Sequence, residues 1–119
     1  MTQEDKELLL KDLCARMPYE VKICCNNTVY NIDAYTKSAF MLAEPLKPDV
    51  CLVAHIEDIK PYLFPMSSMT EEQKTDMIKS SCGIGSDKNV FDWYNKNNLD
   101  YRGLIPMDLA IDATDKNIY

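Results

Sequence analysis

The sequence predicts one α+β domain: an N-terminal helix, a small bent antiparallel sheet or SH3-like barrel of about four or five strands, then two or three C-terminal helices. Three observations support this fold class. The chain has 119 residues, a common size for one domain. Its content of 46% hydrophobic and 27% charged residues is typical of a globular protein. Its apolar spacing is helical in residues 1–18, alternating in 19–65 and mainly helical again in 66–119.

The first helix is predicted from its capping residues and its apolar spacing. Thr2 can cap the amino end, and Asp5 stands three residues later in the capping-box position. Pro18 is expected to end the helix, because the residue before a proline avoids helical geometry. Apolar residues recur at helical spacing between these signals: Leu9, Leu10, Leu13, Cys14 and Met17.

Residues 19–65 are predicted to form the sheet. Strands are expected at residues 21–25, 28–32, 38–43 and 50–56, where β-branched and apolar residues gather or alternate with polar ones. Asn26 and Asn27 suit a tight turn, since asparagine tolerates positive φ. Pro48, like Pro45, should stop the third strand. Pro61 and Pro65 exclude a helix interior, so an extended segment on a sheet edge or across the surface is expected.

Residues 66–119 are predicted to be mainly helical. Thr70 and Gln73 form a capping box for a helix from about Glu71 to Ser81, and Gly83 suits its carboxyl end. After a flexible loop at 83–86, Ser86 or Asp87 can cap a second helix. The apolar side of that helix is expected to hold Val90, Phe91, Tyr94 and Trp93. Asn97 and Asn98 offer a left-handed stop, and an apolar segment at 104–113, broken at Pro106, closes the chain.

Charge and cysteine content limit the possible partners and the compartment. The net charge is −6, and acidic and basic residues are interleaved without a basic stripe, which disfavours direct nucleic-acid binding. The amino end is acidic and no apolar run approaches the ~20 residues that span a bilayer, so we expect a cytoplasmic protein without a membrane span. Five cysteines without framework-like spacing indicate reduced thiols.

The sequence predicts no metal site, no cofactor and no catalytic residue. Cys51 and His55 are the one Cys–His pair at short spacing, and on a strand they would lie about 13 Å apart. A thiol at Cys51, in the most apolar strand, is expected to be buried and inert. The stretch GIGSD at 83–87 lacks the further glycine or the lysine of a phosphate-binding loop. The adjacent carboxylates at 57–58 and 71–72 are expected to be solvated, so the chain is predicted not to be an enzyme.

The stretch DYRG at residues 100–103 has two interpretations. In the first it is a structural turn: Arg102 pairs with Asp100 or a helix end, Gly103 adopts an unusual φ, and Tyr101 packs inward. In the second it is a surface anchor for another protein, because tyrosine, arginine and tryptophan carry much of the binding energy at interfaces. The predicted protein-contact residues of this second interpretation are Tyr62, Phe64, Trp93, Tyr101 and Arg102.

Several stretches give the chain a family resemblance. They read KPYLFPMSSMTEE at 60–72 and DYRGLIPM at 100–107, with DLCAR at 12–16, Asp92-Trp93 and LAIDA at 109–113. With these motifs the chain resembles a family of small uncharacterised proteins found in Bacteroides-type gut bacteria, their prophages and their phages. Family members often carry a histidine just before the DYRG stretch, where this chain has residues 97–99, and a glycine where it has Asp108.

The resemblance implies a mobile-element origin but no activity. We therefore expect a non-enzymatic protein–protein interaction module that acts on a host or phage protein. The alternative is nucleic-acid or nucleotide binding through the small β-barrel, by analogy with other barrels. The partner and the oligomeric state are left open.

Overall fold

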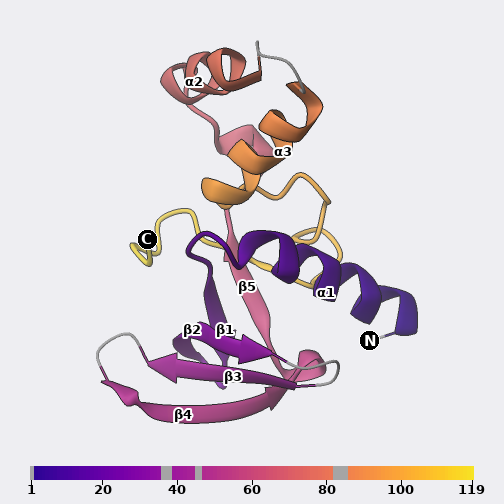
Figure 1. The fold of residues 1–119 in the computed structure, drawn as a ribbon, viewed down its shortest axis with the longest axis vertical. Helices are drawn as coiled ribbons and strands as arrows, with labels where there is room; N and C mark the ends of the chain where they lie inside the picture. Colours follow the sequence, from indigo (N-terminus) through magenta and orange to yellow (C-terminus); the bar gives the residue numbers. More distant parts are fainter. Residues whose placement is uncertain (1, 36–38, 45–46, 82–85) are drawn as a thin grey trace.

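The computed structural model describes residues 2–35, 39–44, 47–81 and 86–119, without the side chains of 47–51, 80–81 and 86–89. It confirms the predicted α+β class (Figure 1). An N-terminal helix, α1 (Gln3–Arg16), precedes a six-stranded sheet, and α2 (Glu71–Ser81) and α3 (Ser86–Lys96) follow. The strand order is linear, with β4 at one end and β6 at the other, so the sheet is open and the SH3-like barrel is wrong. The predicted loop at 83–85 lies outside the described residues.

The strands form a mixed sheet in the order β4-β3-β2-β1-β5-β6. Antiparallel pairing joins β1 to β2, β2 to β3, β3 to β4 and β1 to β5, whereas β5 and β6 are parallel. Asn26 and Asn27 turn β1 into β2 with φ of 51° and 62°, which confirms the predicted tight turn. The strand bounds are β1 (Lys22–Cys25), β2 (Thr28–Tyr35), β3 (Ala39–Glu44), β4 (Lys47–His55), β5 (Lys60–Leu63) and β6 (Ile111–Asp112).

The structure corrects two predictions that depended on proline. Pro61 does not lie on a sheet edge: β5 runs between β1 and β6, with Pro61 opposite Ile23. The strand is short and its Leu63 is fully buried, so apolar burial outweighs the missing N–H donor. The third strand does end at Glu44, before both prolines, but Pro48 itself lies within a strand, β4. β4 is an edge strand, where a residue without an N–H is tolerated.

Helix α1 begins and ends where the sequence predicts. The Asp5 N–H donates to Thr2 Oγ1 at 3.1 Å, and the Thr2 N–H donates to the Asp5 carboxylate at 3.4 Å, so the capping box is present. The helix ends at a C-cap on Met17, one residue before Pro18. Leu9 and Leu13 are fully buried and fix the face that α1 turns to the sheet.

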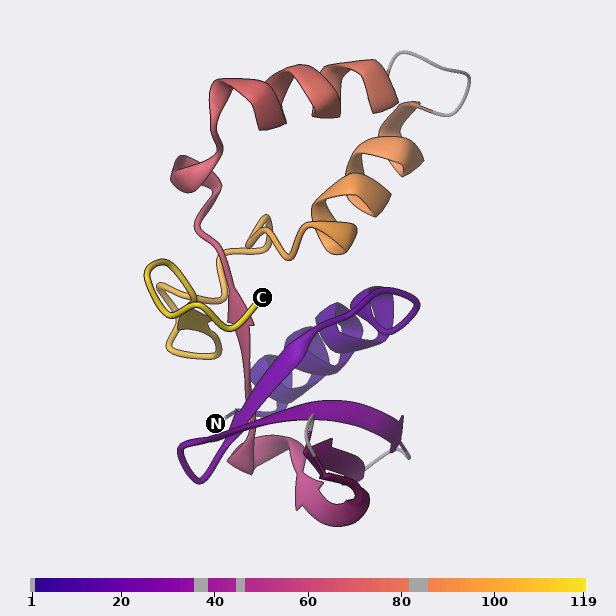
Figure 2. The ribbon, with the colours of Figure 1, turned by 90° about the vertical axis from the view of Figure 1, so that its left-hand side faces the viewer.

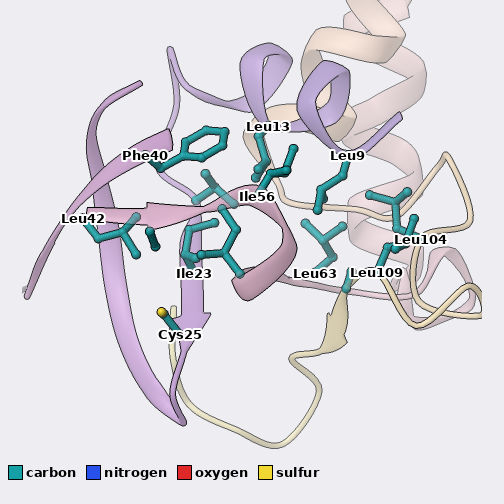
Figure 3. Close-up of a cluster of buried hydrophobic side chains, with 14 residues drawn as sticks. Leu9, Leu13, Ile23, Cys25, Phe40, Leu42, Ile56, Leu63, Leu104 and Leu109 are labelled. Carbon is teal, nitrogen blue, oxygen red and sulfur yellow. The ribbon is translucent and has the colours of Figure 1, made fainter. Parts of the chain in front are cut away.

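The apolar core lies between α1, the sheet and the segment at 104–110 (Figure 3). Its largest fully buried side chains come from α1, β1, β3, β5 and the neighbouring positions Ile59 and Leu104. No member of this cluster belongs to the described residues of α2 or α3. The full cluster is Leu9, Leu13, Val21, Ile23, Cys25, Phe40, Leu42, Ala54, Ile56, Ile59, Leu63, Leu104, Leu109 and Ala110.

Helices α2 and α3 form a hairpin that projects away from the sheet and α1 (Figure 2). The radius of gyration is 14.6 Å, above the ~13.5 Å expected for a compact chain of this length. The Gln73 N–H donates to Thr70 Oγ1 at 3.1 Å and Gln73 Oε1 accepts the Thr70 N–H at 2.9 Å, so the second capping box is also confirmed. Asn98, with φ of 55°, takes the left-handed conformation predicted after α3.

Candidate functional site

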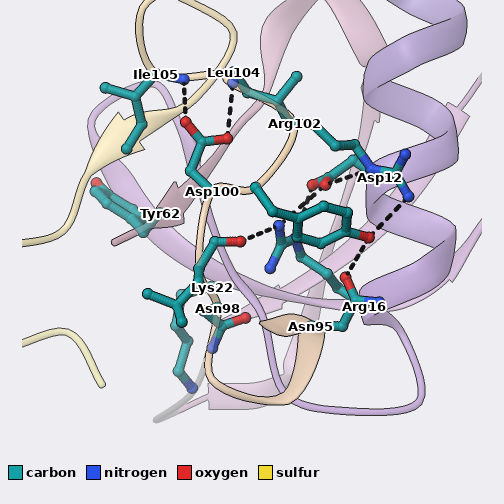
Figure 4. Close-up of polar contacts among 12 residues, drawn as sticks. Asp12, Arg16, Lys22, Tyr62, Asn95, Asn98, Asp100, Arg102, Leu104 and Ile105 are labelled. Atoms are coloured by element: carbon teal, nitrogen blue, oxygen red, sulfur yellow. Dashed lines mark hydrogen bonds and ion pairs between the residues drawn. The ribbon is translucent and has the colours of Figure 1, made fainter. Parts of the chain in front are cut away.

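The DYRG stretch forms a turn at the base of the hairpin. The Phe64 N–H donates to the Asn98 carbonyl and the Asp100 N–H donates to the Phe64 carbonyl, both at 2.8 Å, which places this segment beside the end of β5. The Asp100 carboxylate accepts the N–H groups of Leu104 at 2.7 Å and Ile105 at 2.9 Å (Figure 4). Gly103 has φ of +76°, a conformation that favours glycine.

The buried Asp12 carboxylate forms ion pairs with two arginines, Arg16 and Arg102, beside this turn (Figure 4). Arg16 Nε donates to Asp12 Oδ2 at 2.8 Å and Arg16 Nη2 to Asp12 Oδ1 at 3.1 Å. Arg102 Nε reaches the same Oδ1 at 3.1 Å. The Asp12 and Arg16 side chains are fully buried, and that of Arg102 is 18% exposed. Arg102 thus pairs with a residue of α1 and not with Asp100, so the ion pair that the structural-turn interpretation expected is made with a different acid.

The Tyr101 ring lies against both guanidinium groups. The guanidinium carbon is 5.5 Å from the ring centroid for Arg16 and 4.8 Å for Arg102. Arg102 Nη2 donates to the Tyr101 hydroxyl at 2.9 Å, and that hydroxyl donates to Asn95 Oδ1 at 3.1 Å. These contacts hold the ring by its face and by its hydroxyl, so its orientation is determined by groups of the chain itself.

Aromatic side chains of α3 continue from the Tyr101 ring toward the surface. The centroid of Phe91 is 5.3 Å from that of Tyr101, and the centroid of Tyr94 is 5.5 Å from it with the rings stacked. The Phe91 side chain is 49% exposed. We call Phe91, Tyr94, Tyr101 and Arg102 the arginine–aromatic face.

The structure separates two residues of α3 that the sequence places together on the apolar side of the helix. Phe91 is 49% exposed, so that prediction is wrong for it. Trp93 is 6% exposed, which agrees with the apolar side and contradicts its prediction as a surface anchor. The Trp93 Nε1–H donates to Asp76 Oδ2 at 2.8 Å, so the indole joins α3 to α2. Its N–H needs an acceptor in the interior, and the α2 carboxylate provides one.

Tyr62 and Phe64 do not reach this face as exposed anchors. Tyr62 is 7% exposed, and burial, together with the neighbouring Cys24 thiol, raises the pKa of its phenol to about 12. The half-buried Phe64 packs on Tyr119, with their centroids 5.6 Å apart. The structure therefore unites Tyr101 and Arg102 from the predicted set and gives Tyr62 and Phe64 packing contacts elsewhere.

A cavity of about 490 Å³ lies on the other side of the turn, lined by Phe64, Asn98 and Tyr119 among others. The Tyr119 hydroxyl accepts the Lys22 N–H at 2.9 Å and donates to the Tyr62 carbonyl at 2.6 Å, and burial raises the pKa of the Tyr119 phenol. Asn98 Oδ1 and Arg16 Nη1 are the two buried side-chain atoms without a hydrogen-bond partner in the described part of the chain. The other polar atoms of these side chains are engaged, since Arg16 Nη2 donates to the Leu99 carbonyl at 2.7 Å and Asn98 Nδ2 donates to the Glu20 carbonyl at 2.9 Å.

The residues that the structure describes assemble no metal site, and their cysteines are free thiols. No three His, Cys, Asp or Glu side chains converge there as a metal site requires. Cys24 and the buried Cys25 are free thiols, and burial with the nearby Asp58 carboxylate raises the pKa of Cys25. The Cys51 side chain, and with it the Cys51–His55 pair, lies outside the described residues. None of the described helices combines the length and apolar character that crossing a bilayer requires.

The sequence reasoning missed Asp12 and Arg16 as parts of this site, although a signal was present. The two are four residues apart, so they share one side of α1. That side also carries Leu9 and Leu13, which predicted the buried face of the helix. Two opposite charges within an apolar stripe indicate a buried ion pair rather than a solvated one.

Comparisons with known proteins add no assignment. No protein-family model matches the chain, and searches of curated proteins and of solved structures found no similar protein. The proposals below therefore depend on the geometry of the site and on the resemblance noted in the sequence.

Proposed function

We propose that this chain is a non-enzymatic protein-binding module whose contact surface is the arginine–aromatic face. The observation that carries this proposal is the position of Phe91, which is exposed to 49% while its ring packs on Tyr101. Exposed aromatic side chains next to an arginine have the composition of the residues that dominate protein–protein affinity.

The face is also held in place before binding. Tyr101 is fixed through Asn95 and Arg102, and Arg102 is fixed through the buried Asp12. Side chains that are already ordered lose little conformational entropy when a partner binds, so more of the contact energy contributes to affinity. The buried Arg16 supports the same ring from below the surface.

The alternative of nucleic-acid binding has less support. Its basis was a closed β-barrel, and the sheet is open. The net charge of −6 also opposes the phosphate backbone. The resemblance to proteins of gut-bacterial prophages and phages favours a host or phage protein as the partner.

The test is an affinity capture from a lysate of the bacterium that encodes the chain, with and without nuclease, read by mass spectrometry. Phe91→Ala is compared with Val53→Ala as a control. Val53 is 65% exposed on the edge strand β4, so its replacement also removes an exposed apolar side chain, at a position far from α3 in the sequence. We expect one partner that survives nuclease, is kept by Val53→Ala and is lost by Phe91→Ala. Capture that Phe91→Ala leaves unchanged contradicts the assignment of the surface, and capture that nuclease abolishes favours nucleic acid.

A further inference from the structure

We infer that the arginine–aromatic face binds an acidic segment of its partner, with a carboxylate for Arg102 and an apolar side chain for Phe91. This inference rests on the proposed function and names the chemistry of the partner.

The first argument is the charge of the cluster. Arg16 and Arg102 bring two positive charges, and Asp12 is the one carboxylate that accepts from either guanidinium within the described part of the chain. The carboxylate of Asp100 is engaged by the N–H groups of Leu104 and Ile105 instead. The ion-paired group of Asp12, Arg16 and Arg102 therefore has two cations for one carboxylate, counted without Asp100, in a chain of net charge −6.

The second argument is the donor capacity that remains at the surface. Arg102 uses Nε for Asp12 and Nη2 for the Tyr101 hydroxyl. Its Nη1 donates to no acceptor among the described residues, and the side chain is partly exposed. A planar guanidinium held at two of its nitrogens presents the third in a fixed direction, which suits a carboxylate oxygen from outside.

The third argument is that the apolar and cationic parts share one ring. The Tyr101 ring centroid is 5.3 Å from the Phe91 centroid and 4.8 Å from the Arg102 guanidinium carbon. Phe91 and Arg102 are therefore separated by a single ring, that of Tyr101. A partner that reaches both needs an apolar side chain and a carboxylate at neighbouring positions of one segment. One arginine on an acidic protein does not form the row of cations that a phosphate backbone requires, so the geometry favours a carboxylate.

The experiment measures fluorescence anisotropy of three labelled peptides that alternate leucine with glutamate, with glutamine or with lysine. We expect the glutamate peptide to bind most tightly and to weaken as salt rises, because an exposed charge pair is screened. Arg102→Gln should weaken it by roughly tenfold to a hundredfold. Lys60→Gln is the matched control, since it removes one positive charge at the far end of β5. Arg102→Lys, which keeps the charge, should lose less than Arg102→Gln.

The outcomes separate the two proposals. Salt-sensitive binding of the glutamate peptide by the unaltered chain supports the inference even if Arg102→Gln fails to fold. Equal binding of all three peptides, or no peptide binding while Phe91 still governs capture from lysate, overturns the acidic segment and leaves the protein-binding module standing. Loss of both readouts contradicts both proposals. If a single-stranded oligonucleotide binds more tightly than the glutamate peptide and also depends on Arg102, the ligand group is a phosphate, and the carboxylate inference is wrong.

Discussion

The body of the molecule and its helical hairpin are stabilised by different interactions. The body, comprising α1, the sheet and residues 100–119, contains the whole apolar cluster. In the hairpin, no described side chain of α2 is buried, and the indole of Trp93 bonds to a carboxylate of α2. Helices of this length are marginal alone in water. The hairpin therefore depends on a few aromatic and polar contacts, whereas the body has a packed core.

The arginine–aromatic face spans the junction between these two parts. Phe91 and Tyr94 belong to the hairpin, and Tyr101 and Arg102 belong to the body. A partner that contacts both parts stabilises the hairpin against local unfolding.

The largest effect is expected from Asp12→Ala. It leaves the buried Arg16 without its counter-charge and removes the link from α1 to Arg102. Breaking a buried pair from one side costs about 3–5 kcal/mol of unfolding free energy. Urea denaturation followed by circular dichroism measures it, with Asp33→Ala as the control, because Asp33 is an exposed carboxylate of β2. Equal cost in the two variants would show that the pair does not anchor the body.

Trp93→Ala should break the hairpin and spare the body. The change removes the buried indole and its bond to Asp76. Hydrogen exchange should accelerate across α2 and α3, while the amides of α1 and β1 keep their protection. The local cost is about 3 kcal/mol or more. Uniform acceleration along the chain would instead mean that body and hairpin unfold as one unit.

The sequence predicted the elements with local signals and missed those set by contacts between distant residues. The capping boxes at Thr2 and Thr70 and the Asn26–Asn27 turn are local, and the structure has all three. The parallel strand β6 depends on pairing with β5, nearly fifty positions earlier by residue number, so its short sequence carries no signal of its own.

The candidate site could be predicted only in part. The Tyr101–Arg102 pair was found from its residue types, because these are the types that interfaces use. Whether an aromatic residue of α3 faces inward depends on what packs against it. Trp93 faces the carboxylate of Asp76 and Phe91 faces outward over Tyr101, and neither neighbour is visible in the helical spacing of α3.

Alkaline pH should destabilise the body. The folded-state pKa of Tyr62 lies above the unfolded value of 10.0, at about 12. Because the pKa of Tyr62 is higher in the folded state, the protonated phenol stabilises the fold fully below pH 10, and this stabilisation is lost as the pH rises from 10 toward 12. The loss is on the order of 2 kcal/mol, and the raised pKa of Tyr119 acts in the same direction. Thermal melts across this range measure it, and Tyr62→Phe should flatten the dependence. An unchanged slope in Tyr62→Phe would contradict the assignment.

The smallest effects come from two matched cap deletions. Thr2→Ala and Thr70→Ala each remove a side-chain oxygen that accepts an N–H at 3.1 Å, worth about 1 kcal/mol. In α1 the core holds the rest of the helix, so only its first turn should exchange faster. In α2 the whole helix should lose protection, because none of its described side chains, those of residues 71–79, is buried. Identical exchange patterns for the two variants would remove the distinction between body and hairpin.

The bridge between Phe64 and Leu99 has a consequence for how the protein can diversify. The chain leaves the body at residue 64 and returns beside it at residue 99, so the described segments between them start and end at adjacent positions. Insertions are tolerated where their ends already meet, because the host strands keep their register. We therefore expect that the hairpin can be lengthened, shortened or exchanged for another segment while β5 and its neighbours stay paired. In this view the body is the constant part of the fold, and the α2–α3 hairpin is the part that can vary.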